Sequence, residues 1–572
     1  MAVTKNEPYA LSNPLSVLLQ KPPADFTRAD LLRVIAEKGI ERITFHYTGL
    51  DGKLKELRIP VADAAQAESV LAEGERADGS SLFKGMVDTA VSDLYVVPVY
   101  RTAFLNPFDG AGLDFVCRYL TKDGEPAPFA PDNILARAAE HVRADTGLEM
   151  RALGELEFFL LGEAAGNLFV PPKQQGYHGS APFIKSGPIL NEMVRHITRI
   201  TGAVKYAHSE VGFLDRVQSE NAEIDGRRAE QLEIEFLPRP IADMADNLVI
   251  ARWIVRNVAA QHGSVATFAP KIEDGVAGNG LHIHMELARD GRSVMTGADG
   301  RLSEEARRLI GGLLEYADTL TAFGNTVSAA YLRLVPHQEA PTRICWSDFN
   351  RSVLIRVPLG CNNLPGLSRR VNPRDAEEFS RSGSRQTVEL RSPDGSANVH
   401  LLLAGLAMAA DWGFGSAKSA LVPGKTPLEL ADYLYVKGNI FDDKELLKRL
   451  PELPASCVAS GRLLLAKRGL YERDGIFPAS VIDYAARALD AEKDEFMNQT
   501  LLIDLPVDQR LVATRRIMHK DLHRNCRPGP APRPRRKDEP HAPRRYDPRG
   551  ALARGLPPRK ARPDSHGLLG NG

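Results

Sequence analysis

In four short segments of the chain, apolar and polar residues alternate over several positions. In "GELEFFL", Leu156, Phe158 and Leu160 fall on one side of an extended chain, and Glu155 and Glu157 fall on the other. The same period of two recurs in "EQLEIEF", "LHIHMEL" and "TVELRSPD". Each segment therefore predicts a strand with one face in a core and one polar face.

The polar faces of these predicted strands are rich in carboxylates and imidazoles. In the last three segments they carry Glu233, Glu235, His282, His284, Glu286, Glu389 and Arg391. One such face alone is usually a solvated sheet surface. Four in one domain favour a shared site, because clustered carboxylates repel one another unless cations neutralise them. Mg²⁺ or Mn²⁺ suits a Glu-rich site with few histidines, whereas zinc normally takes more His or Cys.

Helical periodicity and turn signals outline the domains. In "IADMADNLVIARWIVRNVAAQHG", apolar residues recur with a helical period, and Gly263 is placed to end the helix. A helix predicted from Arg28 to Lys38 leads into two alternating runs around "LDGK", which indicates a hairpin. We predict an α+β protein, with an N-terminal leader over residues 1–25, a small domain over 26–122 and a larger domain over 123–521.

The charge balance separates the body from the C-terminal tail. The 572 residues contain 73 basic and 73 acidic side chains, but from Asp521 onward there are 13 Lys or Arg against 5 Asp or Glu. This Pro- and Arg-rich segment has almost nothing to bury, so residues 522–572 are predicted to be disordered. Binding of nucleic acid through the tail is disfavoured, because Tyr546 is its only aromatic residue.

Several protein classes are disfavoured. The longest apolar run, Leu401 to Ala410, is about half of a membrane crossing, and the first 22 residues do not resemble a secretory signal. Five scattered cysteines predict reduced thiols and a cytoplasmic location. "LVPGKT" lacks the first glycine of a phosphate loop, and "AGNGLHIH" is no dinucleotide fingerprint.

Two further motifs of the chain contain arginines that could act together with the carboxylate faces. "YLRLVPHQEAP" supplies Arg333, and "NRSVLIRVP" supplies Arg351 and Arg356. Beside a metal-binding face, arginines are suited to hold a phosphate or a carboxylate substrate. Metals and arginines without a phosphate loop indicate phosphoryl chemistry on another scaffold.

Over about residues 28–500 the chain resembles the glutamine synthetase family. The matching blocks, in the order of the family, are "DGKLKELRIP", "ADGSSLFKG", "GELEFFL", "HSEVG", "EIEF" with "ADN", "TFAPK", "GLHIHMEL", "RLVPHQEAP", "NRSVLIRVP" and "VELRSPDGSANVHL". The resemblance implies a β-grasp-like domain followed by a catalytic domain with a curved antiparallel sheet and surrounding helices. It also implies a ring-shaped homo-oligomer whose sites are shared between neighbouring subunits.

The resemblance implies two or more Mg²⁺ or Mn²⁺ ions per site, with ATP as co-substrate. The implied ligands are Glu157, Glu210 and Glu233 for one metal, and Glu155, His282 and Glu389 for the metal on the ATP side. Glu223 is a rival for Glu233, because 23 residues separate Glu210 from Glu233. We choose Glu233, since the family places "ADN" fourteen residues after this glutamate and Asn247 fits, and treat residues 212–230 as containing an insertion.

The other implied roles concern the substrates. His284 and Arg351 resemble ATP contacts, while Ser81, Gly278, Arg333 and Arg391 resemble residues around the ammonium, the glutamate and its phosphate. Asp78 would draw in ammonium at the site of the neighbouring subunit, Arg356 would neutralise the transferring phosphate, and Glu339 would close the site and take a proton from ammonium. The implied activity is that of a glutamate–ammonia ligase, in which ATP activates glutamate as γ-glutamyl phosphate before ammonia displaces phosphate.

Departures from the family pattern leave two alternatives open. Ala277 stands where an asparagine that helps to hold glutamate is expected, and Thr387 stands where an arginine is common. No tyrosine lies in a context that resembles the adenylylation loop. The alternatives are a ligase for another amine, such as a polyamine or methylamine, and a catalytically silent member that works through its tail.

Overall fold

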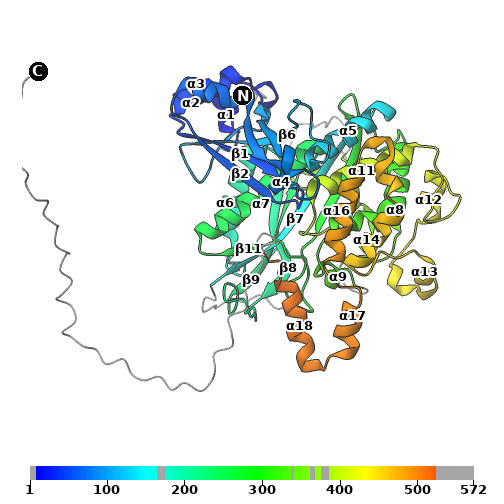
Figure 1. Cartoon of the computed structure of the whole chain (residues 1–572). Coiled ribbons are helices and arrows are strands. Elements are labelled where there is room, and N and C mark those ends of the chain that lie inside the picture. The colour runs from blue at the N-terminus through cyan, green and yellow to red at the C-terminus, as the bar shows by residue number, and fades with distance from the viewer. Residues whose placement is uncertain are drawn as a thin grey trace, which may run out of the picture. The chain divides into compact units, whose positions relative to one another are not determined.

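The computed structural model describes residues 8–163, 169, 174–335, 340–360, 367–374 and 385–522. Figure 1 shows two β-sheets with helices around them, so the predicted α+β class is confirmed. Among these residues, no helix combines the length and the apolarity that a membrane crossing requires.

The N-terminal sheet has the strand order β2-β1-β6-β4-β3, with β5 paired to β6. The predicted hairpin is confirmed, since β1 and β2 are antiparallel and Thr48 lies opposite Leu54. Gly52 in its turn has a φ of +75°, a conformation that glycine adopts without strain. β1 also pairs with β6 in parallel, which makes this sheet mixed. Its elements are α1 (Pro14–Leu19), η1 (Pro23–Asp25), α2 (Arg28–Lys38), β1 (Arg42–Thr48), β2 (Leu54–Pro60), α3 (Ala64–Glu73), β3 (Glu75–Asp78), α4 (Gly79–Leu82), η2 (Thr89–Val91), β4 (Asp93–Pro98), η3 (Tyr100–Thr102), β5 (Phe104–Leu105) and β6 (Gly112–Leu120).

The larger sheet has the order β14-β15-β16-β12-β7-β9-β8, and all of its neighbours are antiparallel except β14 and β15. The four strands predicted from alternation all belong to this sheet and lie next to one another as β16, β12, β7 and β9. Its strands are β7 (Glu149–Gly162), β8 (Val204–Leu214), β9 (Arg228–Phe236), β10 (Arg239–Pro240), β11 (Val265–Thr267), β12 (Leu281–Arg289), β13 (Arg292–Ser293), β14 (Trp346–Asp348), β15 (Ile355–Val357) and β16 (Val388–Leu390).

Helices cover the apolar side of this sheet and pack against one another. The predicted helix α7 ends at Gln261, and Gly263 beyond it has a φ of +63°. α8 and α11 cross closely, because a Cβ on Gly312 would meet the carbonyl oxygen of Ala409 at 1.8 Å. The helices are α5 (Pro131–Thr146), α6 (Gly187–Thr201), α7 (Ile241–Gln261), α8 (Glu304–Gly324), α9 (Ala330–Arg333), α10 (Leu367–Val371), α11 (Val399–Phe414), α12 (Pro427–Tyr433), η4 (Ile440–Asp442), α13 (Lys444–Arg449), α14 (Cys457–Ala466), α15 (Gly469–Glu472), η5 (Arg473–Gly475), α16 (Ala479–Asp490), α17 (Met497–Gln499), η6 (Thr500–Asp504) and α18 (Val507–His519).

A buried charge network connects β6 of the N-terminal sheet with helices α5, α7 and α11. Arg118 on β6 donates to Asp246 on α7 at 2.6 Å and lies 3.6 Å from Asp132 on α5. His400 on α11 lies 3.4 Å from the same Asp246. Removal of one partner would leave a buried charge without compensation, so the network fixes how β6 meets α5 and α7.

Candidate active site

The polar faces of the central strands line one cavity of about 1140 Å³. Nine of its lining residues are the charged or imidazole side chains predicted from alternation: Glu155, Glu157, Glu233, Glu235, His282, His284, Glu286, Glu389 and Arg391. Register explains their convergence, because His282 lies opposite Glu155 and Glu157 lies opposite Glu233 on adjacent strands. In a sheet, opposite residues point to the same face.

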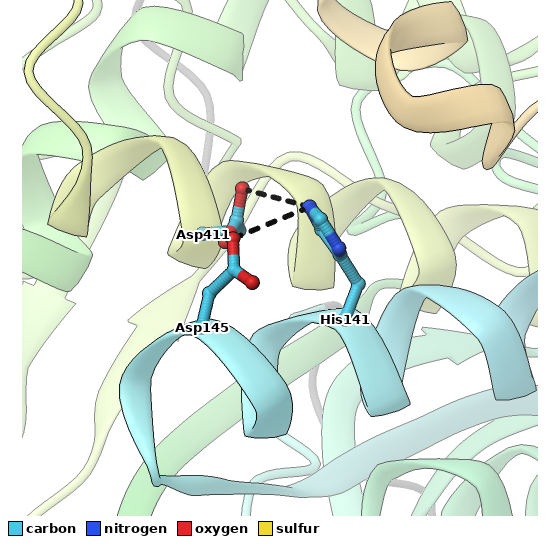
Figure 2. Close-up of side chains that lie close together, drawn as sticks. All are labelled: His141, Asp145 and Asp411. Carbon is cyan, nitrogen blue, oxygen red and sulfur yellow. Dashed lines mark ion pairs between the residues drawn. The ribbon is translucent and has the colours of Figure 1, made fainter.

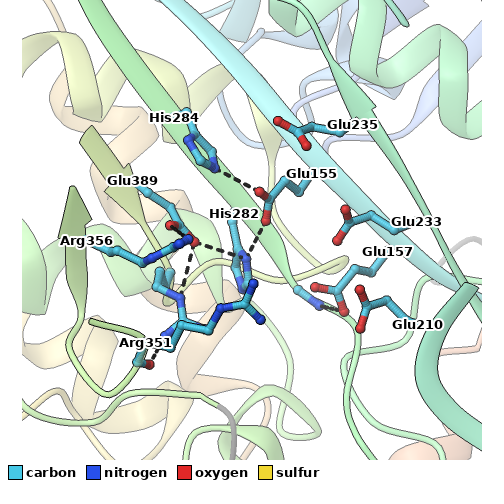
Figure 3. Close-up of polar contacts among 12 residues, drawn as sticks. Glu155, Glu157, Glu210, Glu233, Glu235, His282, His284, Arg351, Arg356 and Glu389 are labelled. Carbon is cyan, nitrogen blue, oxygen red and sulfur yellow. Dashed lines mark hydrogen bonds and ion pairs between the residues drawn. The ribbon is translucent and has the colours of Figure 1, made fainter. Parts of the chain in front are cut away.

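One group of metal-ligand candidates lies on β7, β12 and β16. Glu155 Oε2 is 2.8 Å from His282 Nδ1, which is 3.4 Å from Glu389 Oε1 (Figure 3). The other oxygen of Glu155 is 2.9 Å from His284 Nε2. Burial would raise the pKa of Glu155, but His284 and His282 outweigh burial and hold this pKa well below its usual range. Glu155 is therefore an ionised acceptor for a cation.

The second group lies on β7, β8 and β9 and contains three carboxyl groups, where the first group contains two. His208 Nε2 is 3.2 Å from Glu233 Oε1, and His208 Nδ1 is 3.6 Å from Glu210 Oε1. Glu157 accepts hydrogen bonds from Gln231 Nε2 at 3.0 Å and from the backbone N–H of Gly280 at 2.9 Å. Figure 3 shows the carboxylates of Glu157, Glu210 and Glu233 turned toward the same space.

Repulsion within this second group changes its protonation. Burial, together with the charges of Glu157 and Glu233, raises the pKa of Glu210 to about 8. Burial and the neighbouring glutamates Glu155 and Glu157 also raise the pKa of Glu233 well above its usual range. A divalent cation would remove this repulsion, and carboxylate oxygens with an imidazole are donors that Mg²⁺ and Mn²⁺ accept. The residues present thus fit the metals that the sequence predicts.

A β-bulge directs Glu210 into the cavity. Ser209 pairs with Leu232 and Phe213 pairs with Glu230, so three residues of β8 lie opposite the single residue Gln231 of β9. Bulges of this kind re-aim side chains next to active sites. Glu223, the rival for Glu233, lies between β8 and β9 in the 215–227 turn and is not among the cavity-lining residues described.

Three arginines surround the first metal-ligand group. Arg356 Nη1 donates to Glu389 Oε2 at 2.9 Å, and Arg391 Nε lies 3.2 Å from Glu389 Oε1. Arg333 Nη2 lies 3.4 Å from His282 Nε2. Arg351 also lines the cavity, and its backbone oxygen accepts a hydrogen bond from Arg391. The predicted arginines are thus brought to one cavity, where they can neutralise phosphate oxygens.

The 268–280 loop forms another wall of the cavity. Gly278 lines it, and a Cβ on Gly278 would meet the carbonyl oxygen of Pro270 at 2.3 Å, so the loop folds too tightly for a side chain there. A Cβ on Gly280 would meet Glu157 Oε1 at 2.8 Å. Ala277 lines the cavity with its methyl group and offers no side-chain hydrogen bond to a substrate.

Two predicted site residues lie apart from the cavity of this chain. Asp78 is the last residue of β3 and caps the N-terminus of α4, and Ser81 Oγ donates to Asp78 Oδ2 at 2.5 Å. Hydrogen bonds from Ser80 and Ser81 lower the pKa of Asp78 to about 2, so this exposed carboxylate is ionised at neutral pH. Among the described residues, neither Asp78 nor Ser81 lines the cavity. Glu339 lies outside the described residues.

The structure adds two site residues to which the sequence analysis assigned no role: His208, which lines the cavity, and Gln231, which contacts a lining residue. His208 contacts both Glu210 and Glu233, and Gln231 holds Glu157. His208 had a signal, because "HSEVG" places it two positions before Glu210 on the same strand face. Gln231 had a similar signal, since it lies two positions before Glu233 in "EQLEIEF".

A second histidine–carboxylate cluster lies on the helices (Figure 2). His141 Nε2 on α5 is 3.6 Å from Asp145 and from Asp411 on α11, and 3.4 Å from Asp474. Arg473 Nη1 lies 2.5 Å from Asp411, the one buried carboxylate of the three, whereas Asp145 and Asp474 are more than half exposed. Since an arginine already neutralises Asp411, we assign this cluster to packing of α5 against α11.

Two family models match the chain over the parts just described. Residues 39–122 match the model described as "Glutamine synthetase, beta-Grasp domain", and residues 129–426 match "Glutamine synthetase, catalytic domain". The fold and the cavity therefore define a two-domain ligase with a carboxylate-lined site. The chain belongs to the glutamine synthetase family, whose members use ATP and divalent metals.

Named relatives agree with this membership. The glutamine synthetase of Thermococcus kodakarensis is 32% identical over 491 residues, which cover 83% of this chain and 97% of the relative. That of Pyrococcus horikoshii is 32% identical over 418 residues, 73% of this chain and 81% of the relative.

Solved structures show the same fold at lower identity. A glutamine synthetase of Plasmodium falciparum superposes with a TM-score of 0.64 at 20% identity and covers 83% of this chain and 97% of its own. A complex of GmaS with ADP has a TM-score of 0.62 at 20% identity and covers 84% and 98%. At this identity the likeness concerns the fold alone.

Proposed function

We propose that this chain ligates ammonia to the γ-carboxylate of glutamate, with ATP as co-substrate and γ-glutamyl phosphate as the intermediate. The observation that carries the proposal is the metal-ligand group of Glu155, His282 and Glu389, which lies in a cavity large enough for a nucleotide. Arg356 and Arg391 both contact Glu389 of this group. A carboxylate is a poor acyl donor, and phosphorylation supplies the leaving group that amide formation requires.

The two ligand groups would hold two or more Mg²⁺ or Mn²⁺ ions. Bound there, the ions would supply positive charge against the phosphate oxygens of ATP. Glu155 is ionised and ready to accept a cation, whereas Glu210 and Glu233 must lose protons first. The residues therefore prepare the first group for binding and make occupancy of the second depend on pH.

The arginines would orient and neutralise the anionic substrates. Arg356 and Arg391 are held in place by Glu389, and Arg333 is buried and fixed by its hydrogen bond to the carbonyl of Ser392 at 2.9 Å. A fixed guanidinium costs little reorganisation when phosphoryl charge develops. His284, held between Glu155 and Thr387, is proposed to contact ATP.

The amine is proposed to enter near Glu210. Ammonium would be drawn by the ionised Asp78 and by Ser81 of a neighbouring subunit, and Glu339 would accept its proton. This assignment requires the proposed homo-oligomeric ring, in which sites are shared between subunits. A cytoplasmic location is proposed with it, since glutamate and ATP are both available there.

One observation favours a second candidate, a ligase for an organic amine. Tyr177 and Tyr206 line the cavity, each about half exposed, with ring centroids 5.5 and 5.7 Å from that of His208. Aromatic faces beside carboxylates can bind an alkylammonium through cation–π contact. A polyamine or methylamine would use the same activated acyl group.

A phosphate-release assay separates the two candidates. Purified protein would be given ATP, glutamate and Mg²⁺ or Mn²⁺, with ammonium, methylamine, a polyamine or no amine. Glutamine synthetase activity requires that ammonium give the highest kcat/KM and that the amide product be glutamine. Turnover with an organic amine and none with ammonium would refute the proposal, and the absence of turnover with every amine would refute both candidates.

A further inference from the structure

The 268–280 loop has an outer face that two additional segments cover. Its inner face lines the cavity through Lys271 and residues 275–278. One covering segment is the 215–227 turn between β8 and β9, where the sequence predicts an insertion. The other is α18 with residues 520–522, beyond the range that the family models match. We name these two segments together the clamp.

Arg515 of α18 joins the two parts of the clamp to the loop. Its Nε donates to both oxygens of Glu273 in the loop, at 3.2 and 2.9 Å, while its Nη1 donates to Gln218 Oε1 in the turn at 2.7 Å. The ion pair is largely shielded from water, since the side chains of Arg515 and Glu273 are 18% and 10% exposed. Shielded, charge-assisted hydrogen bonds are stronger than exposed ones.

His519, one helical turn further, repeats this bridging arrangement. Its Nε2 lies 2.8 Å from the carbonyl oxygen of Ile272 in the loop, and its Nδ1 lies 2.9 Å from Ser219 Oγ in the turn. A carbonyl oxygen only accepts, so Nε2 carries the hydrogen and Nδ1 can accept from the serine hydroxyl. Residues four apart share one helix face, so a single face of α18 holds both the turn and the loop.

Apolar packing supports the same contact. Val217 and Ile224 of the turn and Leu522 after α18 are buried in one cluster with Ile272 and Val276 of the loop. This cluster is separate from the main core of the protein. The carbonyl oxygen of Leu522 also accepts a hydrogen bond from Thr267 Oγ1 at 2.6 Å, at the start of the loop.

From the loop, the contacts continue into the candidate active site. Asn279 donates to the carbonyl of Ala269 at 2.8 Å and closes the loop on itself. Gln231 Nε2 reaches the carbonyl of Gly278 and Glu157 Oε2, both at 3.0 Å. The loop therefore lies between the clamp and a proposed metal ligand. Ala277 contributes no side-chain hydrogen bond, so the backbone position of this wall must be set from elsewhere.

We propose that the clamp is a positioning device for the acyl-substrate wall of the active site. Arg515 and His519 are positioning residues: they hold the 268–280 loop against the cavity so that residues 275–278 meet the substrate in a fixed conformation. The proposal deepens the proposed function, on which it rests only for the identity of the substrate as glutamate.

The test compares three single variants of the full chain. Arg515→Ala and His519→Ala each remove a bridge to the loop. Arg516→Ala is the matched control, because the contacts described for Arg516 go to the exposed Glu220 of the turn. Hydrogen–deuterium exchange of the loop amides is measured with each variant, together with Tm and with KM for glutamate and for ATP.

We expect faster exchange in the 268–280 loop for Arg515→Ala and His519→Ala, but not for Arg516→Ala. The glutamate KM should rise about fivefold to tenfold in the first two variants, as expected for the loss of a charge-assisted or buried hydrogen bond, with the ATP KM within about twofold. The double variant Arg515→Glu/Glu273→Arg, in which the two charges are swapped, should recover part of the protection of the loop amides against hydrogen exchange.

The exchange data keep this proposal separate from the proposed function. Unchanged loop exchange in both test variants would overturn the positioning role, whatever the activity. Equal changes in Arg516→Ala would also overturn it, because they would indicate general destabilisation. Loop exchange that responds as expected in a protein that does not turn over glutamate would refute the proposed function and leave the positioning role intact.

Discussion

The raised pKa of Glu210 predicts that metal binding to the second ligand group depends steeply on pH. This pKa lies at about 8, against an ordinary value of 4.5, because the carboxyl group is buried beside Glu157 and Glu233. The unfolded chain therefore ionises this carboxyl group at a lower pH than the metal-free folded protein does, so the loss of unfolding free energy grows as pH rises from about 4.5 to about 8. At pH 7 it amounts to about 3 kcal/mol. A divalent cation relieves this cost only after the proton has left.

Below pH 8, a metal that binds the second ligand group must displace at least the proton of Glu210. The affinity for Mn²⁺ should therefore fall about tenfold for each pH unit and each displaced proton as pH decreases, and it should level off above about pH 8. In Glu210→Gln that proton is absent and the repulsion on Glu233 is smaller. The number of protons released for each bound metal should fall by about one in this variant. Its metal affinity at high pH should also drop, because one ligand is lost.

Calorimetric titration of chelator-treated protein with Mn²⁺, at about pH 6.5, 7.5 and 8.5, would measure both effects. Buffers with different ionisation enthalpies would count the protons released. Glu223→Gln is the matched control, since this glutamate lies in the 215–227 turn and not in the cavity lining. A wild-type affinity that does not change between pH 6.5 and 7.5, or an equal slope in Glu210→Gln, would refute the reasoning.

Three further predictions concern activity and assembly. Glu157→Gln removes charge at nearly constant volume, so it should abolish metal-dependent phosphate release at an unchanged Tm, whereas an active variant would exclude Glu157 as a metal ligand. If Asp78 attracts ammonium across a subunit boundary, Asp78→Ala should raise the apparent KM for ammonium several-fold and change the ATP KM little, and steady-state kinetics with varied ammonium would show it. Truncation after Asn525 retains α18 and Leu522, so phosphate release and the mass measured by light scattering should stay as in the full chain, and loss of either would contradict a tail without a structural role.

The strand faces were predictable because a period of two is a geometric property of extended chain. Once "GELEFFL" is a strand, Glu155 and Glu157 must share a face, and pairing with neighbours of the same pattern brings the faces together. The choice of Glu233 rested on the resemblance to the family, through the spacing between this glutamate and "ADN". The structure places Glu233 3.2 Å from His208, which lines the cavity.

Other features depend on contacts that no local pattern contains. The direction in which Glu210 points is one of them, because two extra residues in β8 break the simple register there. The pairing of Arg515 with Gln218 and Glu273 joins segments hundreds of positions apart, and neither partner carries a motif that would indicate it. Asp78 shows a different limit, since the role proposed for it, at the site of another subunit, would leave no mark in the cavity of its own chain.

The hairpin of β8 and β9 has an evolutionary consequence. Glu210 and Glu233 are 23 positions apart in the chain, yet their strands are neighbours, because residues 215–227 project beyond the two strands as a turn. A lineage can lengthen or shorten that projection without moving either carboxylate, as long as the pairing of His208 with Glu233 is kept. Fixed spacing is then a poor criterion for finding distant members of this family, and cross-strand partnership is the property that selection on the chemistry would preserve.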